Sequence, residues 1–436
     1  MLPCFIDGTP ESQHALDRLC ARGEADFTRV EADVRAILAR VREEGDSAVL
    51  DYAERFDKRR PAPGRLVLRD FGGAAALGRL APEARAALEL GASRIRAFHE
   101  KQRAHEASTF ELTDADGCTL GTRVLPIARA GVYAPGGKAR YPSSVLMSAI
   151  PAQVAGVREI VLATPLSGGP GDDAILAAAH LSGVTALVDA GGAHAIAALA
   201  YGTQSVPRVD KIVGPGNLYV ACAKRLVYGV VDIDGVAGPS EILVVADDTA
   251  DPRLVAADLL SQAEHDEAAY PLLVCMSVAF VEAVSRELAT QVASLPRAAI
   301  ARASLAAHGA AFVVHSRDRL ASLADAVAAE HVSLQVADPA SLAAHVRAAG
   351  AIFLGAATPE AAGDYLAGPS HVLPTGGTVR FGSPLGVHDF VTRTSMLRYP
   401  PAALARQASA ITAFARLEGL EAHARAVEAR LAPHEK

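Results

Sequence analysis

The sequence predicts an α/β protein with two Rossmann-like parallel-sheet domains in series and helical extensions at its N- and C-termini. Three observations support this. Short apolar runs alternate with helical stretches from about residue 141, the alternation occurs twice, and both ends of the chain have helical periodicity. Strands that alternate with helices need crossover connections, which favour parallel sheets. With 436 residues, half of them hydrophobic, the chain can form two or three domains with substantial cores.

The N-terminal region and the first repeat are predicted in chain order. Apolar residues recur at helical spacing over 32–56 and again over 82–102. A helix over 143–157 then introduces the first α/β repeat. Its expected strands are EIVLATP (159–165), TALVDA (185–190) and KIV (211–213), with helices between and after them.

The second repeat contains five apolar runs that we predict as strands. They are EILVVAD (241–247), YPLLVCMS (270–277), AFVVHS (311–316), HVSLQV (331–336) and AIFLG (351–355). A helix that begins at Pro252 follows the first of them. Beyond Pro400 the chain is predicted to be helical again. This last segment is too short to form a core alone, so we expect it to pack on another domain or another subunit.

Composition argues against several classes of function. The net charge of −7, with both signs interspersed, gives no electrostatic footprint for nucleic acid or an anionic membrane. The five cysteines are scattered and lack C-x-x-C spacing, so neither a disulfide framework nor a thiolate metal site is indicated. The first residues do not resemble a secretion signal, and the apolar stretches are too short to span a bilayer. We therefore expect a cytoplasmic protein.

The segment LLSQAEHDEAAY (259–270) is unusually polar for a helix that follows the apolar run VAADLL. Gln262 and His265 are three residues apart, so on a helix they can face one object. Burying a polar group without a partner costs about 1–3 kcal/mol, which means that something should compensate. A metal ion is one candidate. A core histidine satisfied by a carbonyl is the alternative, and it is favoured when this pair is considered alone.

Three further stretches combine acidic and histidine side chains. Glu330 and His331 open a strand-like run, a common position for a catalytic acid–base pair. Asp364 and His371 flank a Gly-Pro turn, where loops present functional groups. Glu418 and His423 lie five residues apart near the C-terminus. Each pair alone is also compatible with an ordinary surface pair or a solvated helix face.

Dinucleotide binding needs separate evidence, because no G-x-G-x-x-G follows a predicted strand. The nearest substitutes are Gly191-Gly192 and the GPGN turn at 214–217, each placed between a strand and a helix. Backbone amides at helix N-termini favour anions such as a pyrophosphate. Taken singly, both turns are better explained as ordinary strand-to-helix connections.

Taken together, five segments resemble the histidinol dehydrogenase family, in order and over nearly the whole chain. They are GVYAPGGKARYPSSVLMSAIPAQVAGV, VDKIVGPGNLYVACAKRLVYG, DIDGVAGPSEILVVADDTADPRLVAADLLSQAEHD, GDYLAGPSHVLPTGGTVRFGSPLGVHDFVTRTS and LEGLEAHARAV. The resemblance implies an enzyme with one zinc ion per subunit that oxidises L-histidinol through L-histidinal to L-histidine with two NAD+, at the end of histidine biosynthesis. The alternatives are a zinc-dependent NAD dehydrogenase of another small hydroxylated substrate and a catalytically inactive zinc-binding or regulatory protein.

The resemblance also implies site residues by motif position. The implied zinc ligands are Gln262, His265, Asp364 and His423. His331 is implied as the general base, and Glu330 as the group that activates water. The implied substrate contacts are Ser240, Gln262, His265, His331, Asp364, His371, Glu418 and His423. The implied NAD contacts are Tyr133, His194 and Asn217, and His194 stands where the family more usually has a glutamine.

We expect four parts in the chain. Residues 1–28 form an N-terminal arm, and 29–128 together with 240–385 form the zinc- and substrate-binding domain. Residues 129–239 form an inserted NAD-binding domain, and 386–436 form a helical tail. The resemblance implies a homodimer in which this tail crosses to the partner, so that Glu418 and His423 enter the partner's site.

Overall fold

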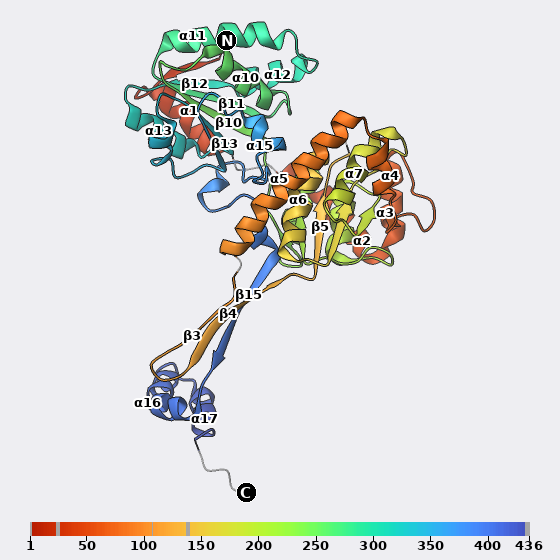
Figure 1. Cartoon of the computed structure of the whole chain (residues 1–436), viewed down its shortest axis with the longest axis vertical. Helices are drawn as coiled ribbons and strands as arrows, with labels where there is room; N and C mark the ends of the chain where they lie inside the picture. The colour runs from red at the N-terminus through yellow and green to blue at the C-terminus, as the bar shows by residue number, and fades with distance from the viewer. Residues whose placement is uncertain (1, 23–26, 107, 137–139, 432–436) are drawn as a thin grey trace.

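The computed structural model describes residues 2–22, 27–106, 108–136 and 140–431. Two α/β domains lie side by side, and a long arm projects from them (Figure 1). Each domain contains a six-stranded sheet, and a third sheet of three strands forms the arm. The predicted α/β class with two parallel-sheet domains is confirmed. Within these ranges, every helix falls short of the length and apolarity that a membrane span needs.

The first domain has a parallel sheet with the strand order β1-β12-β11-β10-β13-β14. Its strands are β1 (Cys4–Ile6), β10 (Glu241–Ala246), β11 (Tyr270–Cys275), β12 (Ala310–Val313), β13 (His331–Gln335) and β14 (Ala351–Leu354). Its helices are α1 (Pro10–Cys20), α10 (Pro252–Ala263), α11 (Val278–Val292), α12 (Ala298–Ala307), α13 (Arg317–Val327), α14 (Pro339–Ala343) and α15 (Glu360–Tyr365). Alternate residues of β10 enter apolar clusters on opposite faces, because helices cover both sides of the sheet.

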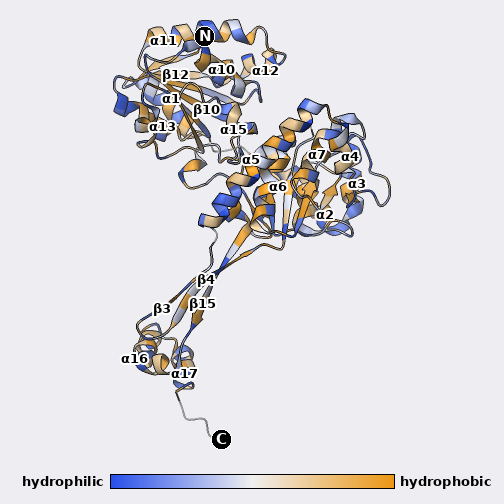
Figure 2. Ribbon diagram, viewed as in Figure 1, coloured by the Kyte–Doolittle hydropathy of each residue, from blue (hydrophilic) through white to orange (hydrophobic). Residues whose placement is uncertain are grey.

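The second domain has a sheet with the order β2-β7-β6-β5-β8-β9, parallel except for β2. Its strands are β2 (Val67–Leu68), β5 (Arg129–Tyr133), β6 (Glu159–Ala163), β7 (Ala186–Val188), β8 (Lys211–Val213) and β9 (Asp232–Ile233). Its helices are α2 (Thr28–Glu44), α3 (Asp46–Tyr52), the π-helical η1 (Ala53–Asp57), α4 (Gly73–Arg79), α5 (Pro82–Glu106), α6 (Pro142–Ala155), η2 (Pro170–Asp172), α7 (Asp173–Leu181), α8 (Gly192–Tyr201) and α9 (Leu218–Val227). Hydrophobic residues concentrate in its strands and in α6 (Figure 2).

The structure divides the N-terminal region differently from the predicted boundaries. Most of 29–128 belongs with the second domain, because α2 packs on α8 and α9, α5 packs on α6, and β2 pairs with β7. The apolar face of α2, including Val34 and Val41, shares one core with Leu199. Residues 2–22 are also more than an arm, since β1 pairs with β12 and α1 packs on α13 in the first domain.

The helical pattern predicted over 32–56 is interrupted at Gly45. This glycine has a φ of 62°, a conformation that glycine adopts easily and that ends α2. A Cβ at this position would also lie 2.1 Å from the Gln204 side-chain oxygen. The chain restarts as α3 and continues directly into η1. Helical periodicity was therefore predicted correctly, but the break at Gly45 was not.

The arm is an antiparallel ribbon of β3 (Phe110–Thr113), β4 (Thr119–Pro126) and β15 (Val391–Arg398). At its far end it carries α16 (Pro401–Leu417) and α17 (Glu421–Glu428), well away from both domains (Figure 1). Two short 3₁₀ turns, η3 (Thr378–Arg380) and η4 (Val387–Phe390), precede β15. The tail predicted over 386–436 is therefore only partly helical. Strand β15 pairs with β4 over its whole length.

Candidate active site

The predicted acid–base pair lies at the amino edge of the first sheet. Glu330 precedes β13 and His331 begins it, while Glu241 begins the neighbouring strand β10. The register of the two parallel strands places His331 opposite Ile242, so strand pairing brings these side chains together. Ligands of open parallel sheets usually bind beyond the carboxyl ends of the strands, so this site departs from the general rule.

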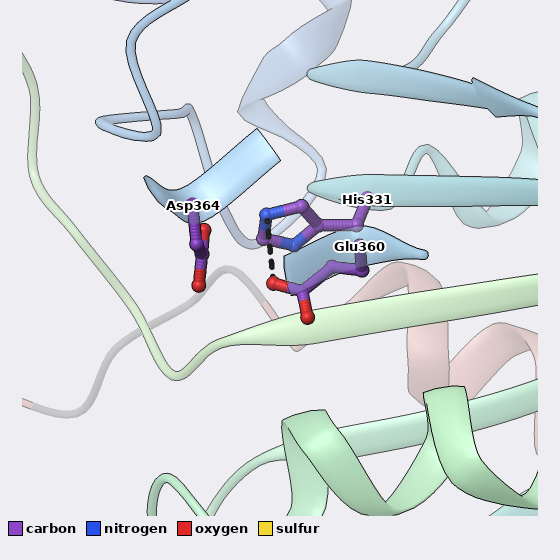
Figure 3. Close-up of side chains that lie close together, drawn as sticks. All are labelled: His331, Glu360 and Asp364. Atoms are coloured by element: carbon purple, nitrogen blue, oxygen red, sulfur yellow. Dashed lines mark ion pairs between the residues drawn. The ribbon is translucent and has the colours of Figure 1, made fainter. Parts of the chain in front are cut away.

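His331 is held in one tautomer. Its Nδ1 lies 2.9 Å from the backbone oxygen of Glu241, and because a carbonyl only accepts, Nδ1 carries the proton. Its Nε2 is therefore unprotonated and lies 3.7 Å from Oε1 of Glu360 (Figure 3). Burial lowers the pKa of His331 to about 4, so the ring is neutral at pH 7. A neutral imidazole whose Nε2 carries no proton can act as a general base.

Glu330 is buried beside this histidine. Its Oε2 accepts a hydrogen bond of 2.9 Å from the backbone N–H of Glu241 and lies 3.6 Å from Nδ1 of His331. Burial raises the pKa of Glu330 well above its ordinary value, and the charges of neighbouring carboxyl groups add to the rise. The site therefore concentrates acidic groups in a region shielded from water.

Glu360 was missed by the sequence analysis. It begins α15, its Oε2 accepts a hydrogen bond of 3.0 Å from Ser261, and its Oε1 has no hydrogen-bond partner among the described residues. Burial, followed by the charge of Asp364, raises the pKa of Glu360 to about 8. Burial also raises the pKa of Asp364 to about 6. The signal in the sequence was the spacing of these two acids, since i and i+4 share one helix face.

His331, Glu360 and Asp364 offer nitrogen or oxygen atoms that all lie within 4.8 Å of one another (Figure 3). Gln262 lies in the last turn of α10, next to the serine that bonds Glu360, and its side chain is 1 % exposed. Its Oε1 has no hydrogen-bond partner within the part of the chain that the structure describes. This is a buried acceptor without a donor, which is the condition that a bound cation would relieve.

His265 and His371 border the same cluster. Helix α10 ends at Ala263, so His265 lies just beyond the helix. Its backbone N–H still donates to the backbone oxygen of Gln262 at 3.1 Å. Its electrostatic influence lowers the pKa values of Glu360 and His371, which places it near both. His371 bonds the backbone oxygen of Asp364 through Nδ1 at 3.1 Å, which leaves its Nε2 free to contact a substrate.

The donor set fits a divalent cation of the zinc type. Zinc accepts imidazole nitrogens and carboxylate oxygens, and a buried amide oxygen is a neutral oxygen donor. A cation at this position would satisfy Oε1 of Gln262 and favour the ionised forms of the buried carboxyl groups. Three predicted ligands, Gln262, His265 and Asp364, lie around this cluster, whereas His423 does not.

Glu418 and His423 lie in the tail helices, far from the cluster. Glu418 follows the last residue of α16, His423 is in α17, and both are exposed at the end of the arm (Figure 1). There Arg406 bonds Asp116 in the turn between β3 and β4. The arm of one chain therefore holds these two residues away from its own site, and their entry into a partner's site stays a prediction.

Two predicted NAD contacts lie at the carboxyl edge of the second sheet, where parallel sheets commonly bind nucleotides. Tyr133 ends β5, and its hydroxyl accepts a hydrogen bond of 3.0 Å from the N–H of Gly192. Asn217 caps α9 by accepting bonds from the N–H groups of the next turn. Gly214, which precedes this cap, passes so close to Tyr133 that a Cβ would lie 2.1 Å from its backbone oxygen.

The Gly191-Gly192 turn is not a free anion site in this structure. The N–H of Gly191 bonds the Asp57 carboxylate at 3.3 Å, and that of Gly192 bonds Tyr133. Both amides at the start of α8 are therefore already satisfied by side chains. Asp57 comes from η1, so the π-helical segment closes this end of the helix.

His194, the third predicted NAD contact, is enclosed beneath the same segment. Its side chain is 1 % exposed and lies against the rings of Tyr52 and Phe56, with centroid distances of 5.7 and 6.0 Å. Neither ring nitrogen has a hydrogen-bond partner among the described residues, although Nε2 lies 3.8 Å from Asp57. Contact between His194 and NAD would require η1 to move.

We expect the free energy of unfolding of His194→Gln to fall less between neutral and acidic pH than that of the wild type. Burial lowers the pKa of His194 to about 4, so the folded protein binds this proton less readily than the unfolded chain. The stability that comes from burying the neutral ring is fully present above about pH 6.5 and is lost as the pH falls towards 4. At pH 5 this loss amounts to about 2 kcal/mol. Urea unfolding at pH 7.5 and pH 5 measures it.

The control for this prediction is His345→Gln, because His345 is an exposed histidine of the first domain. That variant should lose as much stability as the wild type between the two pH values. If His194→Gln also loses as much as the wild type, His194 does not stay neutral in the folded protein.

The loop that carries His371 rests on the second domain. The hydroxyl of Ser370 donates to the backbone oxygen of Met147 in α6 at 3.2 Å, and Arg94 of α5 donates to the oxygen of Leu366 at 2.5 Å. The cluster in the first domain therefore faces the domain boundary. A nucleotide bound at the carboxyl edge of the second sheet would approach the cluster across this boundary.

The cysteines do not provide a nucleophile at this site. Cys118, Cys222 and Cys275 are buried, and burial raises the pKa of the Cys275 thiol to about 11. Cys4 and Cys20 are exposed on the N-terminal segment. Thiolate catalysis of an aldehyde oxidation therefore has no support in the arrangement of these side chains.

Comparison with known proteins gives a consistent result. The family model described as histidinol dehydrogenase matches residues 20–431. The histidinol dehydrogenase of Syntrophotalea carbinolica is 51% identical over 417 residues, which is 96% of each chain. That of Cereibacter sphaeroides is 49% identical over 431 residues, or 99% of each chain. A crystal structure of histidinol dehydrogenase from Elizabethkingia anophelis matches with a TM-score of 0.90 and 32% identity, covering 99% of this chain and 98% of that one.

Proposed function

Because this chain belongs to the histidinol dehydrogenase family, we propose that it oxidises L-histidinol through L-histidinal to L-histidine with two NAD+. The observation that carries the proposal is that the family match, over residues 20–431, includes the buried cluster of His331, Glu360 and Asp364. A neutral histidine base beside buried acids suits the removal of a hydroxyl proton. The matching relatives provide the identity of the substrate.

The proposed cofactor is one zinc ion per subunit, held by Gln262, His265, Asp364 and the partner's His423. Bound there with about one net positive charge, zinc would supply a Lewis acid that holds the amino alcohol through its nitrogen atoms. The support for this ligand set is the buried Gln262 oxygen without a donor and the absence of thiolates from the cluster.

In the first oxidation, Nε2 of His331 takes the hydroxyl proton while hydride leaves the carbinol carbon towards the nicotinamide. The bond from Nδ1 to Glu241 keeps this nitrogen available and fixes the orientation of the ring. Because the base, the substrate and the hydride acceptor are held in place before the reaction, the entropic part of the activation barrier is lowered. Tyr133 and Asn217 are the proposed contacts for the nucleotide at the edge of the second domain.

In the second oxidation, water must add to the aldehyde before another hydride can leave. We assign the removal of the water proton to the Glu330 carboxylate, which lies beside His331. The proton that His331 gained in the first oxidation passes to the carbonyl oxygen, which completes the hydrate and frees Nε2. His331 then takes one hydroxyl proton of the hydrate as hydride leaves to the second NAD+ and the acid forms. Ser240 precedes β10 and His371 has a free Nε2, so both can contact the substrate from the first domain.

The proposed homodimer completes the site. The ribbon exposes large apolar side chains, including Phe110, Leu112 and Leu397, and α16 exposes Phe414 and Leu417. A three-stranded ribbon with so little burial is marginal alone, and exposed apolar patches commonly mark interfaces. Packing of the arm on a partner would bury these groups and bring Glu418 and His423 to the partner's cluster.

The test of this function is the stoichiometry of the reaction. We expect about two NADH per L-histidinol, measured by absorbance at limiting substrate, because the alcohol must pass through two hydride transfers. A chelator should abolish turnover, and added zinc should restore it. One NADH per substrate would contradict the four-electron reaction, and rapid turnover of other amino alcohols alone would favour the related dehydrogenase activity.

A further inference from the structure

A buried ion pair lies directly behind the acid–base pair. Arg22, which follows α1, donates from Nε and Nη2 to the two carboxylate oxygens of Glu241, both at 2.7 Å. The two side chains are 1% and 0% exposed. The residues are 219 positions apart in the chain, so the pair joins the N-terminal segment to the start of β10.

Stability alone does not account for such a pair. Removing two charges from water carries a desolvation penalty that can exceed their attraction, and apolar side chains of similar size often stabilise a fold as well. A bidentate pair does fix geometry, because the planar guanidinium matches both carboxylate oxygens. Its neighbours show which geometry it fixes.

Glu241 contacts both residues of the acid–base pair. Its backbone N–H donates to Oε2 of Glu330 at 2.9 Å, and its Oε2 accepts the backbone N–H of Glu330 at 3.2 Å. Its backbone oxygen accepts from Nδ1 of His331 at 2.9 Å. Its Oε1 also accepts from the N–H of Gly376, at the end of the loop that carries His371. Glu241 therefore ties three parts of the site together.

Arg22 also holds the backbone segment that leads to Glu330 and His331. Its Nη2 donates to the backbone oxygen of Ala328 at 3.2 Å. Ala328 has a φ of 50° and a ψ of 60°, a left-handed conformation that side chains with a Cβ rarely adopt. Such conformations persist where the surroundings fix them, and they cluster at functional sites. This one lies two residues before Glu330.

We propose that Arg22 and Glu241 are positioning residues for the reaction, which hold Glu330 and His331 in the geometry that proton transfer requires. The inference rests on the proposed function, because it assigns the pair to the same two oxidations. Neither residue is among the proposed substrate contacts. Loss of the pair should therefore slow the chemical steps without weakening the binding of histidinol or NAD+.

The test is the double variant Arg22→Gln/Glu241→Gln, which removes both charges together and so leaves neither buried alone. In the full-length enzyme we expect kcat to fall at least about tenfold, with KM for both substrates within about threefold of wild type. Arg22→Lys keeps the positive charge but cannot form the bidentate pair, so its kcat should lie between that of the wild type and that of the double variant.

The matched control is Arg319→Gln. Arg319 forms a bidentate pair with Asp7 at 2.7 and 2.9 Å, and it also ties the N-terminal segment to the first domain. Asp7 follows β1, so this pair lies at the carboxyl edge of the sheet, opposite the site. Arg319→Gln should leave kcat unchanged. Thermal unfolding of every variant separates loss of stability from loss of kcat.

A folded double variant with wild-type kcat would overturn the positioning role, as would an equal fall in kcat for Arg319→Gln. If the double variant does not fold, Arg22→Lys decides the question, because wild-type kcat in that folded variant overturns the role. Nitrogen NMR of His331 gives a readout without substrate. The Nδ1-protonated tautomer should dominate in the wild type and be lost in the double variant, even if the wild type failed to oxidise histidinol.

Discussion

His331→Asn is expected to lower kcat for histidinol oxidation by roughly 10²–10⁴-fold, the usual contribution of a general base. The asparagine amide can still donate to the Glu241 oxygen that now accepts from Nδ1 of the ring. It has no basic nitrogen in the place of Nε2, which faces Glu360. Proton removal should therefore fail while the fold around β13 is retained. Initial rates of NADH formation at saturating substrate measure the effect.

The control for this variant is His345→Asn. His345 also bonds a backbone oxygen through Nδ1, that of Ser341 at 2.9 Å, but it is exposed after α14. Its replacement should leave kcat unchanged. A His331→Asn enzyme that keeps kcat within about threefold of wild type would show that another group takes the proton.

The second large effect is expected for His265→Ala and His423→Ala, each of which should lose both zinc and activity. Removing one ligand of a four-ligand site should weaken zinc binding by more than the roughly 10–100-fold that loss of an outer hydrogen-bond partner costs. His265 lies beside the buried cluster, whereas His423 lies at the end of the arm. Elemental analysis after dialysis measures zinc per subunit.

Asp266→Asn is the matched control for the zinc measurement. Asp266 is exposed and directly follows His265, so its replacement changes a neighbouring charge without touching the cluster. Zinc content in this variant should equal that of the wild type. Wild-type zinc in His265→Ala would contradict the ligand set, and wild-type zinc in His423→Ala would remove the tail from it.

The sequence predicted the two α/β domains because alternation of buried strands and helices is a local property of the chain. Which sheet a helix covers is not local. The apolar face of α2 fits either domain in composition, and only packing on α8 and α9 decides. The ribbon was missed for a related reason, since strands exposed on both faces lack the apolar alternation that marks a half-buried strand.

The candidate site was predicted in part. Gln262 stood out because polar residues interrupt an apolar helix, Glu330 and His331 because they open a strand-like run, and Asp364 because it flanks a Gly-Pro turn. The structure places these four residues around one buried cluster or beside it. Glu241 did not stand out, because an acid at the start of a strand resembles an ordinary solvated end. Its meaning depends on Arg22, more than two hundred residues away. Contacts of that range leave no periodic signal in one sequence.

The most direct test of the account mixes His265→Ala and His423→Ala protomers, each inactive alone. In a hybrid dimer, the intact body of the His423→Ala protomer would receive the intact tail of the His265→Ala protomer. One of the two sites would then be complete. Random exchange makes half of the dimers hybrid, so we expect roughly a quarter of wild-type activity. No recovery, despite exchange shown by native mass spectrometry, would contradict a site completed by the partner's tail.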